Sequence, residues 1–154
     1  MRDEEKKTQA EWGSAQRRDA LLLFEQITGK QVIHNVGGNY RCYTYKAMGG
    51  CSPAGMLVNE NAIVVVKRPA NSAGHRPLLR IGAKQQPWQK AKIKGERQAW
   101  LKAHRYAHYE QCQFELMCTA ATKCYYISYD PRCVDPGDRI GIVELLPDFN
   151  NLKI

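Results

Sequence analysis

The sequence predicts one mixed α/β domain in which helices flank a central β-sheet. Its 154 residues suit a single domain, and a chain of this length buries roughly two-thirds of the surface that its unfolded form exposes. The aliphatic run Ala62–Val66 does not alternate with polar residues, so we expect a strand that is buried on both faces in the middle of the sheet. Helical and strand-like segments follow one another in the order α-β-β-β-β-α-α-β-β, which is typical of a mixed sheet with helices on its faces.

The first helix is expected over Ala10–Thr28. Its apolar residues return every three or four positions, and Gly29 stands where a glycine commonly ends a helix. Residues 1–9 are polar and charged, so we expect a flexible lead-in before a domain that covers residues 10–154.

The other elements are apolar or alternating segments separated by Gly, Pro, Asn and Asp. The expected strands are Gln31–His34, Tyr40–Lys46, Met56–Asn59, Ala62–Lys67, Lys123–Tyr129 and Arg139–Leu145. The expected turns are Gly37–Asn39, Gly49–Pro53, Asp130–Arg132, where Asp130 would bond the backbone, and Asp135–Asp138. The expected helices are a weaker one over Lys90–Tyr106, interrupted near Gly95, and a stronger one over Ala107–Ala120 with a stripe of Cys112, Leu116 and Ala120.

The charge of the chain favours acidic partners. The formal net charge is +8, and nucleic acid is the commonest partner of such a protein. Only Glu96 opposes the basic residues between positions 67 and 105, and two Trp residues lie among them. These candidate phosphate-contacting residues are Lys67, Arg68, Arg76, Arg80, Lys84, Lys90, Lys92, Lys94, Arg97, Lys102 and Arg105. A solvated surface is the alternative, but the density of charge favours contact with DNA phosphates.

The cysteines are expected to be free, and the hydropathy indicates an intracellular protein. The six cysteines show no C-x-x-C spacing, so free, buried thiols are expected rather than an iron–sulfur cluster. The apolar runs are far too short to span a bilayer, and no apolar segment follows the charged start. We therefore expect a cytoplasmic protein without a membrane partner.

Five segments, in this order, resemble motifs of the lambda-exonuclease (YqaJ-type viral recombinase) family. The segments are Trp12–Val32, which contains Arg17, Phe24 and Glu25, then Cys51–Met56, Val65–Pro69, Ala107–Phe114 and Tyr125–Arg132. Each motif is weak alone, but five with the family's order and spacing form a specific pattern. The resemblance implies a restriction-endonuclease-like core, which is a mixed sheet between helices.

The resemblance also implies a phage or prophage origin, DNA as partner, and assembly as a trimer or with phage recombination proteins. The family's N-terminal region and its C-terminal helix have no counterpart here, so the chain is expected to be a minimal form or a fragment.

The family that this sequence resembles has a nuclease site, and this sequence lacks its metal-binding carboxylates. Family members hydrolyse phosphodiesters with Mg²⁺, which prefers carboxylate ligands. The three carboxylate positions correspond to Arg17, Ala54 and Val65, and only the motif lysine, Lys67, remains. Methyl and isopropyl groups cannot bind a metal ion, and Arg17 adds a positive charge. The sequence therefore predicts no metal site and no cofactor.

Other residues offer alternatives to a lost site. Lys67 is expected to contact phosphate, although a lysine at the end of a buried strand commonly just extends to water. Gln111 matches a pocket-lining position of the family, and Glu115 lies one helical turn later, where it could replace a lost ligand. His104 and His108 are spaced for zinc, but the sequence offers no third ligand.

Three functions from different classes are consistent with these residues. The preferred hypothesis is a DNA-binding pseudonuclease. The first alternative is a Mg²⁺-dependent 5′–3′ DNA exonuclease with relocated ligands. The second is a non-enzymatic partner or inhibitor that assembles with an active exonuclease.

Overall fold

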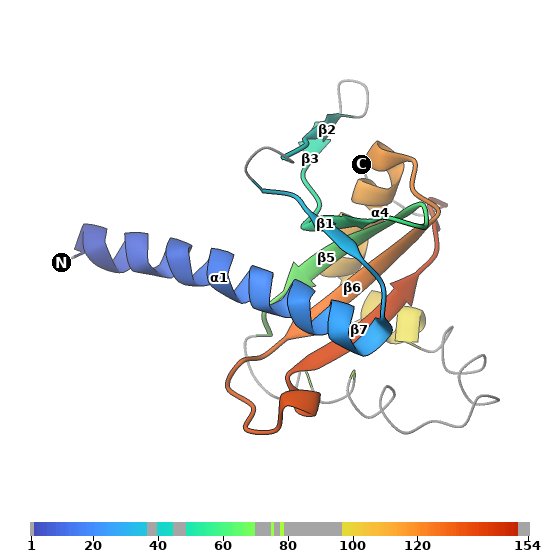
Figure 1. Ribbon diagram of the computed structural model, residues 1–154. Coiled ribbons are helices and arrows are strands. Elements are labelled where there is room, and N and C mark those ends of the chain that lie inside the picture. The colour runs from blue at the N-terminus through green and yellow to red at the C-terminus, as the bar shows by residue number, and fades with distance from the viewer. Residues whose placement is uncertain are drawn as a thin grey trace.

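The predicted mixed sheet between helices is confirmed (Figure 1). The computed structural model describes residues 2–36, 40–44, 49–69, 75, 78 and 97–150, with only the backbone for residues 2–14. The expected turn Gly37–Asn39, the end of the second expected strand and most of the segment between 70 and 96 lie outside the described residues.

The main sheet has five strands in the order β1-β4-β5-β6-β7. Their bounds are Val32–His34 (β1), Gly55–Leu57 (β4), Ala62–Lys67 (β5), Lys123–Tyr129 (β6) and Ile140–Leu145 (β7). β5 and β6 are parallel, and the other neighbours are antiparallel. β5 is therefore the central strand next to β4, as its unbroken aliphatic run predicted.

Helix α1 spans Arg2–Thr28 and therefore begins eight positions before the expected start at Ala10. Residues 2–9 contain no Gly or Pro and are mostly Arg, Glu, Lys and Gln, so their helix propensity extends the helix without an apolar stripe. Gly29, with a φ of 70°, ends the helix as predicted, and its N–H donates to the carbonyl of Glu25 at 2.9 Å. The first turns of α1 extend beyond the sheet (Figure 1).

Alternate side chains of the central strands enter two apolar layers. The layer under α1 contains Ala20, Leu21, Phe24, Val64, Tyr125 and Ile127. The layer under helix α4, which spans Tyr106–Thr119, contains Ile63, Val65, Cys112, Leu116, Cys124 and Tyr126. Residues that follow one another along β5 thus face different helices, which decides where each candidate site residue lies.

β1 does not pair with the strand that follows it in the sequence. β1 pairs with β4 in the main sheet, while Tyr43–Thr44 (β2) pairs with Gly50–Cys51 (β3) in a separate two-stranded sheet. The expected turn over Gly49–Pro53 thus contains a strand. Gly55 permits the close approach of β1, because a Cβ atom there would lie 2.5 Å from Cγ1 of Val32.

The C-terminal half follows the sequence closely. Residues 97–104 are helical, within the range of the weaker expected helix. On α4 the predicted stripe is confirmed for Cys112 and Leu116 but is wrong for Ala120, which is exposed and ends the helix with a φ of 55°. The predicted turn at Asp130 is confirmed by a bond from the N–H of Arg132 at 3.0 Å. Within the described ranges, none of the helices is both long and apolar enough to cross a membrane.

Candidate functional site

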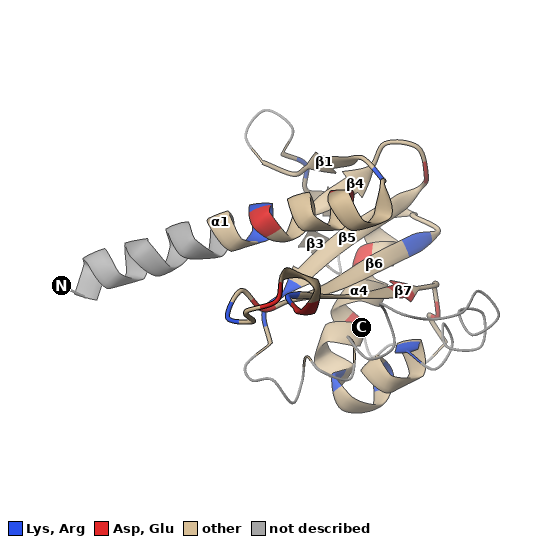
Figure 2. Cartoon of the chain, turned by 60° about the horizontal axis from the view of Figure 1, so that its bottom comes forward, with Lys and Arg blue, Asp and Glu red and all other residues tan. Residues whose placement is uncertain are grey.

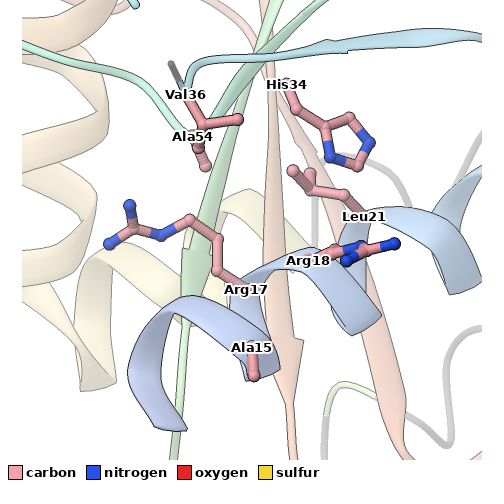
Figure 3. Close-up of a pocket in the computed structure, with 7 residues that line it drawn as sticks. All are labelled: Ala15, Arg17, Arg18, Leu21, His34, Val36 and Ala54. Atoms are coloured by element: carbon pink, nitrogen blue, oxygen red, sulfur yellow. The ribbon is translucent and has the colours of Figure 1, made fainter. Parts of the chain in front are cut away.

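A cavity of about 300 Å³ lies between α1, the end of β1 and the segment before β4 (Figure 3). Its lining residues are Ala15, Arg17, Arg18, Leu21, His34, Val36 and Ala54. Arg17 and Ala54, which the sequence placed at two lost carboxylate positions, therefore lie at one cavity. The lining residues include two arginines, a histidine and apolar side chains, and none of these described residues is Asp or Glu.

The backbone fixes this side of the cavity to the central strand. The N–H of Ala54 donates to the carbonyl of Val64 at 2.9 Å, and the N–H of Asn35 donates to the carbonyl of Ala54 at 3.0 Å. The segment before β4 is thus held between β5 and the end of β1. Lys67 lies three residues beyond Val64, or roughly 10 Å along the strand.

The sequence did not identify Arg18 and His34 as site residues. Arg18 could have been found, because Leu21 lies one turn later on the same face of a predicted helix. His34 could not, because it reaches the cavity through the pairing of β1 with β4, where it is opposite Gly55. Its Nε2 atom lies 3.2 Å from Oε1 of Glu25, whose other oxygen accepts from the N–H of Val32 at 3.3 Å. Glu25 thus orients this histidine.

Val65, the third lost carboxylate position, does not line the cavity. It is buried in the layer under α4 together with Ile63 and Tyr126. Because side chains alternate along a strand, Lys67 points to the same side as Val65, away from α1. The structure thus brings two of the three positions together at the cavity and places Val65 and Lys67 toward α4.

A second polar cluster surrounds Lys67 on that side. Glu115 of α4 is only 3% exposed, and its Oε2 atom has no hydrogen-bond partner within the described part of the chain. Burial raises the pKa of Glu115 to about 7, while the charge of Lys67 and a hydrogen bond from Gln111 act in the opposite direction. Glu115 therefore faces inward toward Lys67, as its position one turn after Gln111 had suggested.

The histidine and the two glutamines of α4 have separate surroundings. Nδ1 of His108 lies 2.9 Å from the hydroxyl of Tyr126, and burial, Lys67 and Arg105 together lower the pKa of His108. Gln111 is exposed on the surface side of Glu115. Gln113 is buried and structural, since it donates to the carbonyl of Leu146 at 2.9 Å and accepts from the N–H of Asp148 at 2.8 Å.

The described residues do not fit a catalytic metal ion. They contain no group of three or more His, Cys, Asp or Glu side chains placed to hold one. The cavity offers guanidinium groups where Mg²⁺ needs hard oxygen ligands. His104 stacks on Trp100, with ring centroids 4.9 Å apart, while His108 contacts Tyr126, so the two histidines that were weighed for zinc have different partners.

A buried Ser–His contact lies elsewhere in the fold. Nδ1 of His75 is 2.8 Å from Oγ of Ser128, and Nε2 donates to the carbonyl of Asp138 at 2.7 Å. Both side chains are almost fully buried, so a substrate cannot reach the hydroxyl. The contact anchors His75 to β6 and to the 3₁₀ turn Pro136–Asp138 (η2).

The predicted basic face is only partly described. Arg76, Arg80, Lys84, Lys90, Lys92 and Lys94 lie outside the described residues. Arg97 bonds the carbonyl of Leu78, and burial lowers its pKa. Lys102 pairs with Asp148 at 3.2 Å. Arg68 and Arg105 are exposed and Lys67 is half-buried. In Figure 2, basic positions lie on several elements, with acidic positions among them.

Comparisons with known proteins show the fold. No protein-family model and no curated sequence matches the chain. The chain is similar to the crystal structure of an alkaline exonuclease, LHK-Exo, from Laribacter hongkongensis, with a TM-score of 0.54 and 21% identity over 85% of this chain and 54% of that one. The complex of LHK-Exo with dAMP matches with a TM-score of 0.53, at the same identity and coverage. The chain thus has the restriction-endonuclease-like fold of this exonuclease and spans about half of its length.

Proposed function

We propose that this chain binds DNA through its phosphate groups and does not hydrolyse it. The proposal rests on one observation: Arg17 and Ala54 lie at the same cavity, which Arg18 and His34 also line. In the nuclease family that the chain resembles, the positions of Arg17 and Ala54 hold carboxylates. A cavity built in this way favours an anion where an active nuclease holds a cation.

The chemistry of the lining suits a nucleotide phosphate. A guanidinium group offers a planar set of N–H donors that matches phosphate oxygens, and it remains charged at every relevant pH. Leu21 and Val36 add apolar carbons to the lining, against which a sugar or base can pack. LHK-Exo, which shares the fold, was crystallised with dAMP, a nucleotide with one phosphate group.

The described residues do not supply the groups that metal-dependent hydrolysis needs. Metal ions in nucleases generate the attacking hydroxide and stabilise the leaving oxygen. Arg17 and Ala54 cannot hold such an ion, and Val65 is an isopropyl group in the α4 layer. Lys67 keeps its motif position and can contact phosphate, but an ammonium group binds no cation.

The alternative of relocated ligands rests on Glu115. Its carboxyl group is buried beside Lys67 and has an oxygen without a hydrogen bond, which is where a displaced ligand would be sought. One carboxyl group is a weak site for Mg²⁺, which takes six ligands with strict geometry. This alternative predicts digestion of linear duplex in Mg²⁺ that Glu115→Gln abolishes.

The test measures binding and cutting on one preparation. Fluorescence anisotropy with a labelled duplex in EDTA should show binding at low salt, and Arg17→Gln should weaken it by about tenfold, the value of one charge-assisted contact. Lys30→Gln is the matched control, because it removes one positive charge just beyond the C-terminal end of α1, where Lys30 pairs with Glu60.

The outcomes separate the hypotheses. Binding without digestion in Mg²⁺ or Mn²⁺ supports the proposal, and digestion by the unmodified chain overturns it in favour of the enzyme. An equal loss of affinity in Arg17→Gln and Lys30→Gln would mean that the cavity is not the binding site. Light scattering on the same sample reports whether the chain assembles as a trimer.

A further inference from the structure

An exposed aromatic side chain, Tyr40, lies close to the cavity that Arg17 and Ala54 line. The hydroxyl group of Tyr40 is 2.9 Å from Oγ of Ser52. Ser52 and Ala54 are two residues apart, so their Cα atoms are separated by at most about 7 Å. The hydroxyl end of the Tyr40 ring is therefore within a short reach of a residue that lines the cavity.

The side chain of Asn35 fixes the backbone at Tyr40 and Arg41 relative to this cavity. Its Nδ2 atom donates to the carbonyl of Arg41 at 2.8 Å and to the carbonyl of Pro53 at 2.9 Å, and its Oδ1 atom accepts from the N–H of Arg41. The N–H of Asn35 also donates to the carbonyl of Ala54 at 3.0 Å. One residue thus ties the segment before β2 to the residues before β4, so the place of Tyr40 is set before a ligand binds.

The Tyr40 side chain is held at its hydroxyl end and yet is 54% exposed. A tyrosine that is already restrained loses little conformational freedom on binding, and its ring still has apolar surface that a ligand can cover. Val36 lines the same cavity and is 57% exposed. Figure 3 shows Val36 next to Ala54, across from Arg17 on α1. Apolar and aromatic surface therefore lies beside a group that suits phosphate.

Arg41 adds a positive charge next to the ring. It is exposed, and its Nη1 atom donates to the carbonyl of Tyr40 at 3.0 Å. A guanidinium group has five N–H donors, so this bond leaves donors for a phosphate oxygen. Cations that contact the backbone and an aromatic ring on which a base stacks are the two parts of a site for single-stranded nucleic acid.

We propose that Tyr40 stacks on an unpaired base of the DNA strand whose phosphate the cavity holds, while Arg41 contacts a neighbouring phosphate. This inference rests on the proposed function, because it assumes that the cavity takes a phosphate. Bases inside a duplex are stacked on their neighbours, so only an unpaired base offers a face to the ring. The ligand is therefore a single strand or the unpaired end of a duplex.

Stacking and phosphate contacts differ in what they require of the ligand. Stacking requires the base and neutralises no charge, whereas a phosphate contact requires only the backbone and responds to salt. A strand without bases therefore keeps the contacts of Arg17 and Arg41 and loses that of Tyr40. This difference makes the contribution of the ring measurable by itself.

The experiment compares a labelled single strand with a strand of the same length whose sugars carry no bases, by anisotropy in EDTA at one salt concentration. The unmodified chain should bind the base-bearing strand about tenfold more tightly. Tyr40→Ala should lose this preference and keep the affinity for the abasic strand, while Tyr40→Phe and Tyr40→Trp should retain the preference because they keep an aromatic ring. Tyr106→Ala is the matched control. It removes a tyrosine ring that is 38% exposed at the start of α4, on the other face of the sheet, and it should change neither affinity.

The outcomes distinguish this inference from the proposed function. Equal affinity of the unmodified chain for the two strands overturns the inference, and this comparison needs no variant. An equal loss on both strands in Tyr40→Ala also overturns it, because Tyr40 would then support the shape of the cavity. In both cases phosphate binding at the cavity stands if Arg17→Gln still weakens binding. If the chain binds neither strand nor duplex, the proposed function fails and this inference fails with it.

Discussion

Glu115 on α4 and Lys67 at the end of β5 face each other with opposite charges, yet burial holds the pKa of Glu115 at about 7. The ammonium group offsets only part of the free energy that it takes to remove a carboxylate from water. Near neutral pH the carboxyl group is therefore often protonated, and Lys67 keeps a charge that is not fully balanced. This leaves Lys67 able to attract phosphate.

The first prediction is that Glu115 makes stability depend on pH. The pKa of Glu115 is raised in the folded chain above its ordinary value of 4.5, so the folded state binds more protons than the unfolded state between these pH values. The free energy of unfolding should then fall as pH rises from about 4.5 to above 7. The effect is on the order of 3 kcal/mol, since one pKa unit corresponds to about 1.4 kcal/mol.

Urea denaturation of Glu115→Gln at pH 5 and pH 8 checks this. At pH 8 the variant should be more stable than the unmodified chain. Its free energy of unfolding should differ little between pH 5 and pH 8. Glu110→Gln, five residues earlier on α4 and only partly buried, is the control and should keep the pH dependence of the unmodified chain. An unchanged pH dependence in Glu115→Gln would contradict the assignment.

The second prediction concerns Val65. Val65 is 4% exposed in the layer under α4, so Val65→Glu places a carboxyl group in an apolar core. It should lower the free energy of unfolding by about 3–5 kcal/mol, with Lys67 on the same face offsetting part of the loss. Urea denaturation measures the change.

Val58→Glu makes the same substitution at a residue that is 46% exposed, and it should have little effect. An equally small effect of Val65→Glu would show that the position still accepts a carboxylate. Restoring the nuclease residues would then be a matter of Arg17 and Ala54 alone.

The central part of the fold could be predicted because its signals are local. The run Ala62–Lys67 and the segment Lys123–Tyr129 consist largely of apolar and aromatic side chains, which indicate burial. Both strands have the predicted bounds. Gly29 ends α1 where the sequence placed the stop. These features can be predicted without knowing which other segments pack against them.

The site could be predicted only in part, because it depends on contacts between distant segments. The meeting of Arg17 with Ala54 followed from the resemblance. The presence of His34 depends on the pairing of β1 with β4, two strands that are not neighbours in the sequence. The separation of Val65 from the cavity follows from strand alternation, once the helix on each face is known.

The third prediction tests the β1–β4 pairing. A Cβ atom at Gly55 would lie 2.5 Å from Cγ1 of Val32 and 3.1 Å from the carbonyl oxygen of Ile33. Because the second contact is with backbone, Gly55→Ala should force the strands apart and lower the free energy of unfolding by about 1–3 kcal/mol. It should also weaken DNA binding, since His34 is opposite Gly55.

Thermal unfolding and anisotropy of the same variant check both effects. Gly137→Ala is the control, because its added Cβ would be 3.4 Å from Oδ1 of Asp135, an ordinary contact. A Gly55→Ala variant as stable as the unmodified chain would contradict the close approach of β1.

The last prediction concerns salt, and it tests whether the cavity binds phosphate. A protein that neutralises DNA phosphates releases counterions, so the logarithm of its affinity falls linearly with the logarithm of salt concentration, by about 0.9 per contact on duplex. We expect a steep fall with little dependence on sequence. Arg17→Gln and Arg18→Gln should each reduce the slope by about 1, because both arginines line the cavity. Lys30→Gln should leave the slope as it is, since Lys30 already pairs with Glu60. Anisotropy titrations over a series of KCl concentrations measure these slopes. If Arg17→Gln lowers affinity but leaves the slope unchanged, Arg17 supports the shape of α1 or the cavity wall, and the phosphate contacts lie elsewhere on the chain.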